Sequence, residues 1–185
     1  QGALTKYFGR KADPPDGEDP YKFRGTEVRQ RSTCDWVGSV QRDLVETLDD
    51  HRATEPVLET LRGHLNTLTS GKVDPERLLI KNRVSKSLEE YTQSTRNVAA
   101  LERRQAQGID AHPGQDVEYV VVDDAKSNRE RVRLRSEDLD GYDPDFYRTR
   151  AIRAAEAVLS PMGVREANIN QYLAEYRDST INAWH

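Results

Sequence analysis

The sequence predicts an α+β fold that is mostly helical, with an N-terminal β-hairpin and a small antiparallel β element further along. Three observations lead to this class. Apolar residues recur at intervals of three and four in several long stretches, which is typical of helices with one buried face. Near the start, two segments rich in Tyr, Phe and Val flank a loop of Pro, Gly and Asp. Later, the run VEYVVVDD is the clearest strand in the chain.

The first elements are two strands, residues 4–11 and 21–29, joined by the turn-forming stretch ADPPDGEDP. A helix is then expected to begin near Trp36, with Asp35 as its N-cap. A second helix follows, and Gly71 lies where it would end. We expect these two helices to pack as an antiparallel pair. Their apolar faces consist of Trp36, Val37, Val40, Leu44, Val45 and Leu48, and of Val57, Leu58, Leu61, Leu65 and Leu68.

The second half of the chain alternates between extended and helical segments. Residues 78–84 are expected to be extended, residues 88–91 to form a short helix, and residues 96–107 a longer helix that ends at Gly108. The strand VEYVVVDD is expected to pair with RVRLRSEDL. In the second segment apolar residues alternate with arginines, which predicts a strand with one solvent-exposed face. A strong helix follows, with Asp143 as cap and Pro144 in its first position. A last helix is expected from residue 165 to about residue 176.

Composition limits the class of protein. Of the 185 residues, 35% are hydrophobic and 32% are charged, so the core is expected to be modest. Cys34 is the only cysteine, which excludes a disulfide framework. We find no run of 18 apolar residues and no signal peptide, and therefore expect a soluble, cytoplasmic protein. The chain has 21 Arg against 7 Lys, with 17 Asp and 15 Glu. This balance resembles proteins of halophiles, although a GC-rich genome would also favour Arg.

We find no constellation for catalysis or for a metal. The acidic pairs Asp49–Asp50, Glu89–Glu90 and Asp123–Asp124 fall at a helix end, in a short helix and at a strand end, and we interpret them as solvated surface. The four histidines are scattered without partners at ligand spacing, which argues against zinc. The candidate site therefore contains no catalytic and no metal-binding residue.

Five segments, taken in order, resemble the C-terminal end of family B DNA polymerases, closest to the archaeal and eukaryotic replicative enzymes. They are KYFGR, RGTEVRQRSTCDW, ERLLIKNRVSKSLEEYTQSTRNVAALERR, HPGQDVEYVVVDD and YDPDFYRTRAIRAAEAVLSPMG. The resemblance covers essentially the whole chain. It implies that residues 1–31 are the end of the palm domain and residues 32–185 the thumb, so that the chain is a fragment of a larger polymerase.

The resemblance also implies where the chemistry takes place. In this family two palm carboxylates hold the metal ions that activate the primer hydroxyl, and both carboxylates would lie upstream of Gln1. The cofactor Mg²⁺ would therefore be bound by the parent enzyme outside this chain. We expect a DNA-directed DNA polymerase as the parent protein and no nucleotidyltransferase activity in the isolated chain.

What remains for these residues is holding the primer–template duplex during DNA replication through sequence-independent backbone contacts. Lys6 and Tyr7 match the Lys–Tyr pair at the end of the family's palm motif, although Tyr7 could also pack as an ordinary strand aromatic. Other candidates match the basic thumb turn, the helix that follows it or the palm–thumb junction. For each single cation, solvated surface is the alternative interpretation. The candidate DNA-binding set is Lys6, Tyr7, Arg29, Arg31, Arg83, Ser85, Lys86, Tyr91, Thr92, Arg96 and Asn97.

The expected partners are primer–template duplex DNA and the rest of the polymerase, namely palm, fingers and exonuclease, with no membrane. A sliding clamp could bind the terminal STINAWH, but Asp178 stands where such tails normally begin with Gln. The alternative function is a non-catalytic helical adaptor module, whose Arg-rich turn binds acidic protein partners. A duplex-holding domain would prefer duplex DNA to a polyanion such as heparin, and an adaptor would not.

Overall fold

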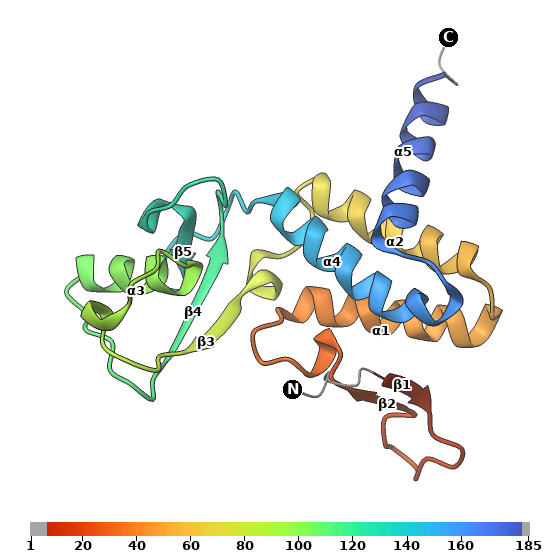
Figure 1. Cartoon of the computed structure of the whole chain (residues 1–185), viewed down its shortest axis with the longest axis horizontal. Coiled ribbons are helices and arrows are strands. Elements are labelled where there is room, and N and C mark those ends of the chain that lie inside the picture. Colours follow the sequence, from red (N-terminus) through yellow and green to blue (C-terminus); the bar gives the residue numbers. More distant parts are fainter. Residues whose placement is uncertain (1–6, 183–185) are drawn as a thin grey trace. The chain divides into compact units, whose positions relative to one another are not determined.

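The computed structural model describes residues 7–182 and confirms the α+β class, with helices making up most of the regular structure (Figure 1). The strands form two antiparallel sheets, one of two strands and one of three. Within the described residues the chain divides into two compact units. The first contains residues 7–30, 37–67 and 148–182, and the second contains residues 31–36 and 68–147.

The first unit opens with the predicted hairpin, in which β1 (Tyr7–Arg10) pairs with β2 (Tyr21–Arg24) and Phe8 lies opposite Phe23. The prediction of a strand over residues 21–29 was too long. Gly25 adopts a φ of 66°, which ends the extended run, and residues 27–29 form the 3-10 turn η1 (Glu27–Arg29). Residues 4–6 of the first predicted strand lie outside the described residues.

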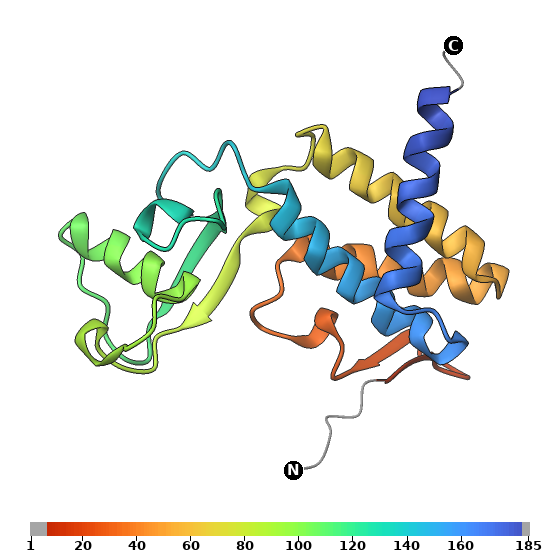
Figure 2. The same cartoon turned by 45° about the horizontal axis from the view of Figure 1, so that its top comes forward.

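The helix pair of the first unit is antiparallel, as predicted, and its two helices lie side by side in Figures 1 and 2. Late in one helix, the Oγ1 of Thr47 lies 3.3 Å from the Oγ1 of Thr60, early in the next. One turn further along, His64 Nε2 lies 2.9 Å from Asp43 Oδ2. From the first contact to the second, the residue number falls in α1 (Asp35–His51) and rises in α2 (Thr54–Thr69). The two helices are therefore antiparallel.

A buried glutamine joins three elements of the first unit. Gln41 of α1 is fully buried, and its Oε1 accepts the Val28 N–H of η1 at 3.0 Å. Its Nε2 donates to Glu27 Oε2 at 2.6 Å and to the Ala154 carbonyl of the next long helix at 3.1 Å. Because all of its polar atoms are used, this side chain fixes η1 against two helices. The remaining helices are α4 (Pro144–Leu159), the 3-10 turn η5 (Ser160–Met162) and α5 (Glu166–Asn182).

The second unit is built on the sheet β3-β4-β5, with β4 in the centre. The predicted pairing of VEYVVVDD with RVRLRSEDL is confirmed, since Tyr119 lies opposite Leu134 and Val121 opposite Val132. One helix packs on β4 and β5 and lies beside the sheet in Figures 1 and 2. The elements are β3 (Ile80–Arg83), η3 (Leu88–Glu90), α3 (Arg96–Ala106), β4 (Asp116–Val121), η4 (Arg129–Arg131) and β5 (Val132–Leu134).

The first turn of α4 anchors this sheet. Asp143 caps the helix as predicted, because its Oδ1 accepts the N–H groups of Asp145 and Phe146 at 3.0 and 3.1 Å. Tyr147, which is fully buried, donates its hydroxyl to the Leu78 carbonyl at 2.9 Å and accepts the Val121 N–H at 3.0 Å. A single hydroxyl therefore connects the segment before β3 to β4.

Candidate nucleic-acid interface

The sheet of the second unit has one apolar and one charged face. Side chains that are directly opposite in an antiparallel pair lie on the same face. In β3 and β4, Ile80 lies opposite Tyr119 and both are buried, whereas Lys81 lies opposite Glu118 and Arg83 opposite Asp116. We call Lys81, Arg83, Asp116 and Glu118 the charged face. It places two cations of β3 at the start of the predicted basic turn.

Asp116 forms ion pairs on the charged face. Its Oδ2 lies 2.7 Å from Arg31 Nη2 and 3.4 Å from Lys81 Nζ, and Arg83 stands directly across from it on β3. Its other oxygen is buried without a hydrogen-bond partner among the described residues. Asp116 is thus in ion-pair contact with two cations, and a third, Arg83, lies across from it on β3 beyond ion-pair distance.

The basic turn, residues 83–92, connects β3 to the loop before α3 and is organised by Tyr91. The Tyr91 hydroxyl accepts the Ser85 N–H at 3.3 Å and lies 3.2 Å from Ser85 Oγ. Lys86 Nζ lies 5.0 Å from the centre of the Tyr91 ring, within cation–π range. Partial burial acts to raise the pKa of Tyr91, but the hydrogen bonds from Ser85 and the Lys86 N–H, together with the Lys86 charge, lower it overall. Three residues predicted from the turn motif are therefore in mutual contact.

Backbone and side-chain bonds hold this turn in shape. Val84 exchanges hydrogen bonds of 2.8 Å with Gly114 and Gln115 on the opposite loop. Ser87 and Glu90 form a capping box around η3. The Arg83 guanidinium lies against the turn at Gly114 and is exposed, and no described carboxylate is within ion-pair distance of it. Thr92 is exposed just after η3. The cations at the start of the turn are thus presented on a fixed backbone.

Arg96 has different surroundings from the cations of the turn. Its Nε and Nη2 donate to the two oxygens of Asp124 at 2.6 and 2.8 Å, and its guanidinium carbon lies 4.5 Å from the centre of the Phe146 ring. Arg131 donates to the same carboxylate at 2.7 Å. These bonds, from Arg96 first, hold the pKa of Asp124 below its ordinary value, against the effect of burial. The interpretation of Asp124 as solvated surface was therefore wrong, because this carboxylate is hydrogen-bonded to two arginines.

One backbone amide at the start of α3 is capped by the chain itself. Thr95 caps the helix by accepting the Val98 N–H at 3.3 Å. Asn97, predicted as a donor to phosphate, is half-buried, and its Oδ1 is buried without a partner among the described residues. Contact of Asn97 with DNA stays a prediction.

Two candidates belong to the first unit. Tyr7 begins β1 opposite Arg24 and is 37% exposed, and Arg29 ends η1 with an exposed side chain. Lys6 lies outside the described residues. The second unit brings together Arg31, Arg83, Ser85, Lys86 and Tyr91. The DNA-binding set predicted from the sequence does not include Lys81 and Asp116. Lys81 lies two positions before Arg83, and Asp116 two positions before Glu118, so the sequence alone indicates that each pair shares one face of its strand. The sequence does not indicate the register that places these two strands opposite each other.

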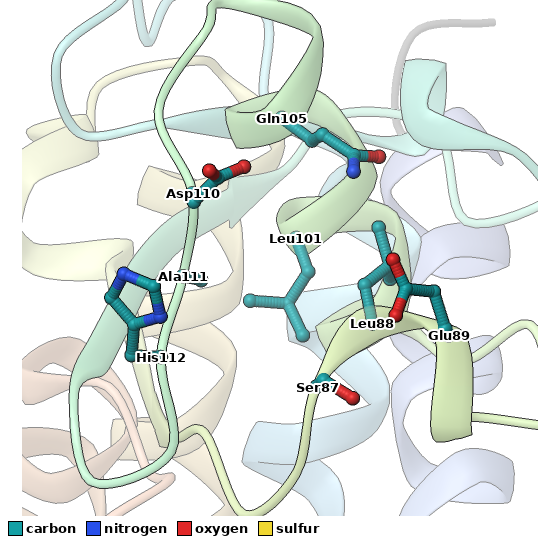
Figure 3. Close-up of a pocket in the computed structure, with 8 residues that line it drawn as sticks. All are labelled: Ser87, Leu88, Glu89, Leu101, Gln105, Asp110, Ala111 and His112. Atoms are coloured by element: carbon teal, nitrogen blue, oxygen red, sulfur yellow. The ribbon is translucent and has the colours of Figure 1, made fainter.

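A hollow of about 210 Å³ lies beside the basic turn (Figure 3). Figure 3 shows that it is enclosed by η3, by α3 and by the loop that follows α3. Leu88 and Leu101 provide apolar surface, whereas Glu89, Asp110 and His112 are exposed at its edge. Its acidic edge does not favour phosphate, so we do not count it as part of the interface.

Two further properties concern the described part of the chain as a whole. Across residues 7–182, no three His, Cys, Asp or Glu side chains are grouped so that they could hold a metal ion. In the same range, none of the helices combines the length and the hydropathy required to cross a bilayer.

Comparisons with known proteins agree with one another. Residues 4–176 match the family model described as DNA polymerase family B. The DNA polymerase of Thermococcus aggregans is 27% identical over 176 residues, covering 91% of this chain and 9% of the relative. That of Thermococcus gorgonarius is 24% identical over 177 residues, covering 91% of this chain and 22% of the relative.

A solved structure shares the fold. The structure of the family B DNA polymerase from the hyperthermophilic archaeon Pyrobaculum calidifontis superposes with a TM-score of 0.69 at 24% sequence identity. The match covers 89% of this chain and 21% of that one. The chain therefore spans about a tenth to a fifth of the length of the polymerases that it matches.

Proposed function

Since the chain belongs to DNA polymerase family B, we propose that it is the palm end and thumb of a DNA-directed DNA polymerase and holds primer–template duplex DNA. The observation that carries this proposal is the family match over residues 4–176, which includes both units. In this proposal residues 1–31 end the palm and residues 32–185 form the thumb. Catalysis belongs to the parent enzyme, whose other domains are the first partners of this chain.

The basic turn is the part of the second unit best suited to a DNA backbone. No described carboxylate lies within ion-pair distance of Arg83 or Lys86, and the exposed Ser85, whose hydroxyl lies 3.2 Å from that of Tyr91, belongs to the same turn. Cations, hydroxyls and backbone amides are the groups that bind phosphate without reading bases. Such contacts suit an enzyme that must accept any template. Tyr91 and Thr92 belong to this surface, and Tyr7, Lys6 and Arg29 would add contacts from the palm side.

Within the candidate set we assign Arg96 and Asn97 a supporting role. Arg96 already has a bidentate partner in Asp124, so a phosphate would have to compete with a fitted carboxylate. We propose that Arg96 fixes the start of α3, and with it the end of the basic turn, while Arg83 and Lys86 carry the phosphate contacts.

The cofactor of the parent enzyme is proposed to be Mg²⁺. The described residues do not fit it, because no group of three possible ligands is present among them. In this proposal the metal is bound by the parent enzyme outside this chain, as the family resemblance implies, and we derive no step through it. A sliding clamp, if it binds this chain, would take the terminal stretch 179–185. In the described part of that stretch α5 continues to Asn182, and residues 183–185 lie outside it.

We also propose that the parent polymerase works in concentrated salt. The chain has 32 acidic against 28 basic residues, and most of the cations are Arg. At about 1 M salt the Debye length is roughly 3 Å, so an overall negative charge no longer repels DNA and only contact pairs survive. Thermal unfolding in increasing KCl tests this proposal. A melting temperature that decreases as KCl is raised from low to molar concentration would argue against it.

The test of duplex holding is the salt dependence of binding. Binding of the 185-residue chain to a labelled primer–template duplex is measured by fluorescence anisotropy at several KCl concentrations, with heparin as competitor. We expect binding that is independent of base sequence and a log–log slope of about −0.9 per phosphate contacted. The variant Arg83→Gln/Lys86→Gln should weaken binding and flatten the slope by about 0.9 for each lost contact.

The matched control removes two charges elsewhere. Arg153→Gln/Arg165→Gln changes two exposed arginines of the first unit that have no carboxylate partner among the described residues. It should leave the slope unchanged. Equal effects of the two double variants, or heparin displacing duplex as readily as duplex itself, would contradict the proposal and favour the adaptor.

A further inference from the structure

Asp116 stands out on the charged face because it opposes the proposed function. A surface that binds phosphate gains nothing from a carboxylate among its cations, yet Asp116 Oδ2 is in ion-pair contact with both Arg31 and Lys81. Its carboxylate offers these cations the same chemistry as a phosphate, namely a negatively charged oxygen at hydrogen-bond distance. Arg31 reaches it from the segment before α1, 85 positions away in the sequence.

We propose that Asp116 is an internal competitor of the DNA phosphate: it holds Arg31 and Lys81 in the free protein and releases them to the duplex. The inference rests on the proposed function, since it names a residue that sets the affinity of the same surface. The Arg31 and Lys81 side chains are 54% and 43% exposed, so both are within reach of an incoming backbone. Exposed ion pairs of this kind contribute little to stability, so they can be exchanged at small cost.

Glu118, the other carboxylate of the charged face, has a different set of charged neighbours. Glu118 Oε2 lies 3.1 Å from Arg135 Nη1, and Arg135 has a second carboxylate, Glu76, at 3.5 Å. Glu118 and Glu76 thus share Arg135, and Lys81, which lies across from Glu118 on β3, is in ion-pair contact with Asp116 instead. Asp116 is in ion-pair contact with two cations, Arg31 and Lys81. Removing the charge of Asp116 therefore releases cations, and removing that of Glu118 leaves Arg135 still paired.

The two oxygens of Asp116 support an exchangeable contact. Both cations contact Oδ2, while Oδ1 is buried and has no hydrogen-bond partner among the described residues. No hydrogen bond to Oδ1 from the described residues fixes the orientation of the carboxylate. Both ion pairs, with Arg31 and with Lys81, therefore depend on Oδ2 alone. A phosphate that approaches Arg31 and Lys81 from solvent therefore competes with Asp116, their ion-pair partner among the described residues.

The experiment compares Asp116→Asn with Glu118→Gln in the 185-residue chain. The two variants remove one charge each from the same face of the same strand, two positions apart. Duplex binding is measured by anisotropy from about 50 to 200 mM KCl, a range over which one phosphate contact changes affinity roughly three- to fourfold. Asp116→Asn should bind the duplex several-fold more tightly than wild type at the low end and with a steeper slope, while Glu118→Gln should stay within about twofold of wild type.

The double variant Arg31→Gln/Asp116→Asn identifies the cation that is released. It should lose much of the gain of Asp116→Asn, because the freed guanidinium is then missing. Asp116→Ser, which cannot pair with cations, repeats the test if Asp116→Asn unfolds, and circular dichroism confirms the fold of each variant. Equal gains in Asp116→Asn and Glu118→Gln, or weaker binding by Asp116→Asn, would overturn the inference while duplex holding stands. If neither wild type nor any variant binds duplex, the proposed function fails and the inference falls with it.

Discussion

Arg83 and Arg96 are the two arginines of the candidate set whose surroundings differ most. Arg83 is exposed on the charged face, with no described carboxylate in ion-pair contact. Arg96 donates two hydrogen bonds to Asp124 and covers the ring of Phe146. Because a guanidinium that is already bound bidentately has few free donors left, the two should differ in what their removal costs.

Arg96→Ala should lower the free energy of unfolding by about 1–3 kcal/mol, since it removes charge-assisted hydrogen bonds to a partly buried carboxylate. Arg83→Ala should change it by less than about 0.5 kcal/mol, as is usual for exposed side chains. Urea unfolding followed by circular dichroism measures both. A destabilisation of Arg83→Ala as large as that of Arg96→Ala would contradict the roles assigned to these residues.

The same carboxylate gives a pH dependence with a defined sign. The pKa of Asp124 is lowered from its ordinary 3.8, chiefly by Arg96 and then by Arg131, against burial. The stabilisation is therefore fully present above pH 3.8 and is lost as the pH falls below it, through the lowered pKa. The difference in unfolding free energy between wild type and Asp124→Asn should be constant near neutrality and shrink below that pH. A difference that grows on acidification would be inconsistent with this account.

Single residues were the hardest to assign from sequence. The motif around Arg83, Ser85 and Lys86 identified a turn whose residues are in contact, since local spacing determines a local turn. It could not show that Arg96 faces Asp124, because that contact joins residues 28 positions apart. Nor could it show that Arg31 and Asp116 form an ion pair, because they are 85 positions apart.

At the scale of elements, the contact between the first turn of α4 and the sheet of the second unit depends on Tyr147. Its hydroxyl satisfies the Leu78 carbonyl and the Val121 N–H in the core of the second unit. Tyr147→Phe leaves both groups unpaired and should reduce the free energy of unfolding by about 1–3 kcal/mol. Tyr142→Phe removes one half-buried bond, to the Leu68 carbonyl, and should cost less. A larger loss in Tyr142→Phe, again by urea unfolding, would contradict this ranking.

Most elements were predictable because their signals are local. The apolar period of three and four located α1 and α2, and Asp143 with Pro144 marked the start of α4. The failures around η1 have one local cause and one non-local cause. Gly25 permitted the positive φ that ended β2 early, and the buried contacts of Gln41 with η1 form across the unit. A predicted end near residue 176 for α5 was short, since the helix continues to Asn182.

At the scale of the whole chain, an acidic protein is proposed to hold an acidic polymer. The positive charge needed for this is local: Arg31 and Lys81 beside Asp116, Arg83 across from it on β3, and Lys86 over the Tyr91 ring in the adjoining turn. Short-range contacts of this kind act even where salt screens the net charge. The proposed thumb would therefore need no basic composition, only a fixed turn that presents a few cations.

Hydrogen exchange of the 185-residue chain with and without primer–template duplex tests this claim most directly, because it reports which backbone the DNA covers. We expect duplex to slow exchange in peptides spanning residues 83–92, to the same extent for two duplexes of unrelated sequence. Peptides spanning residues 160–165 of the first unit serve as an internal reference and should not change. Protection that spares residues 83–92, or that depends on the base sequence, would contradict the account.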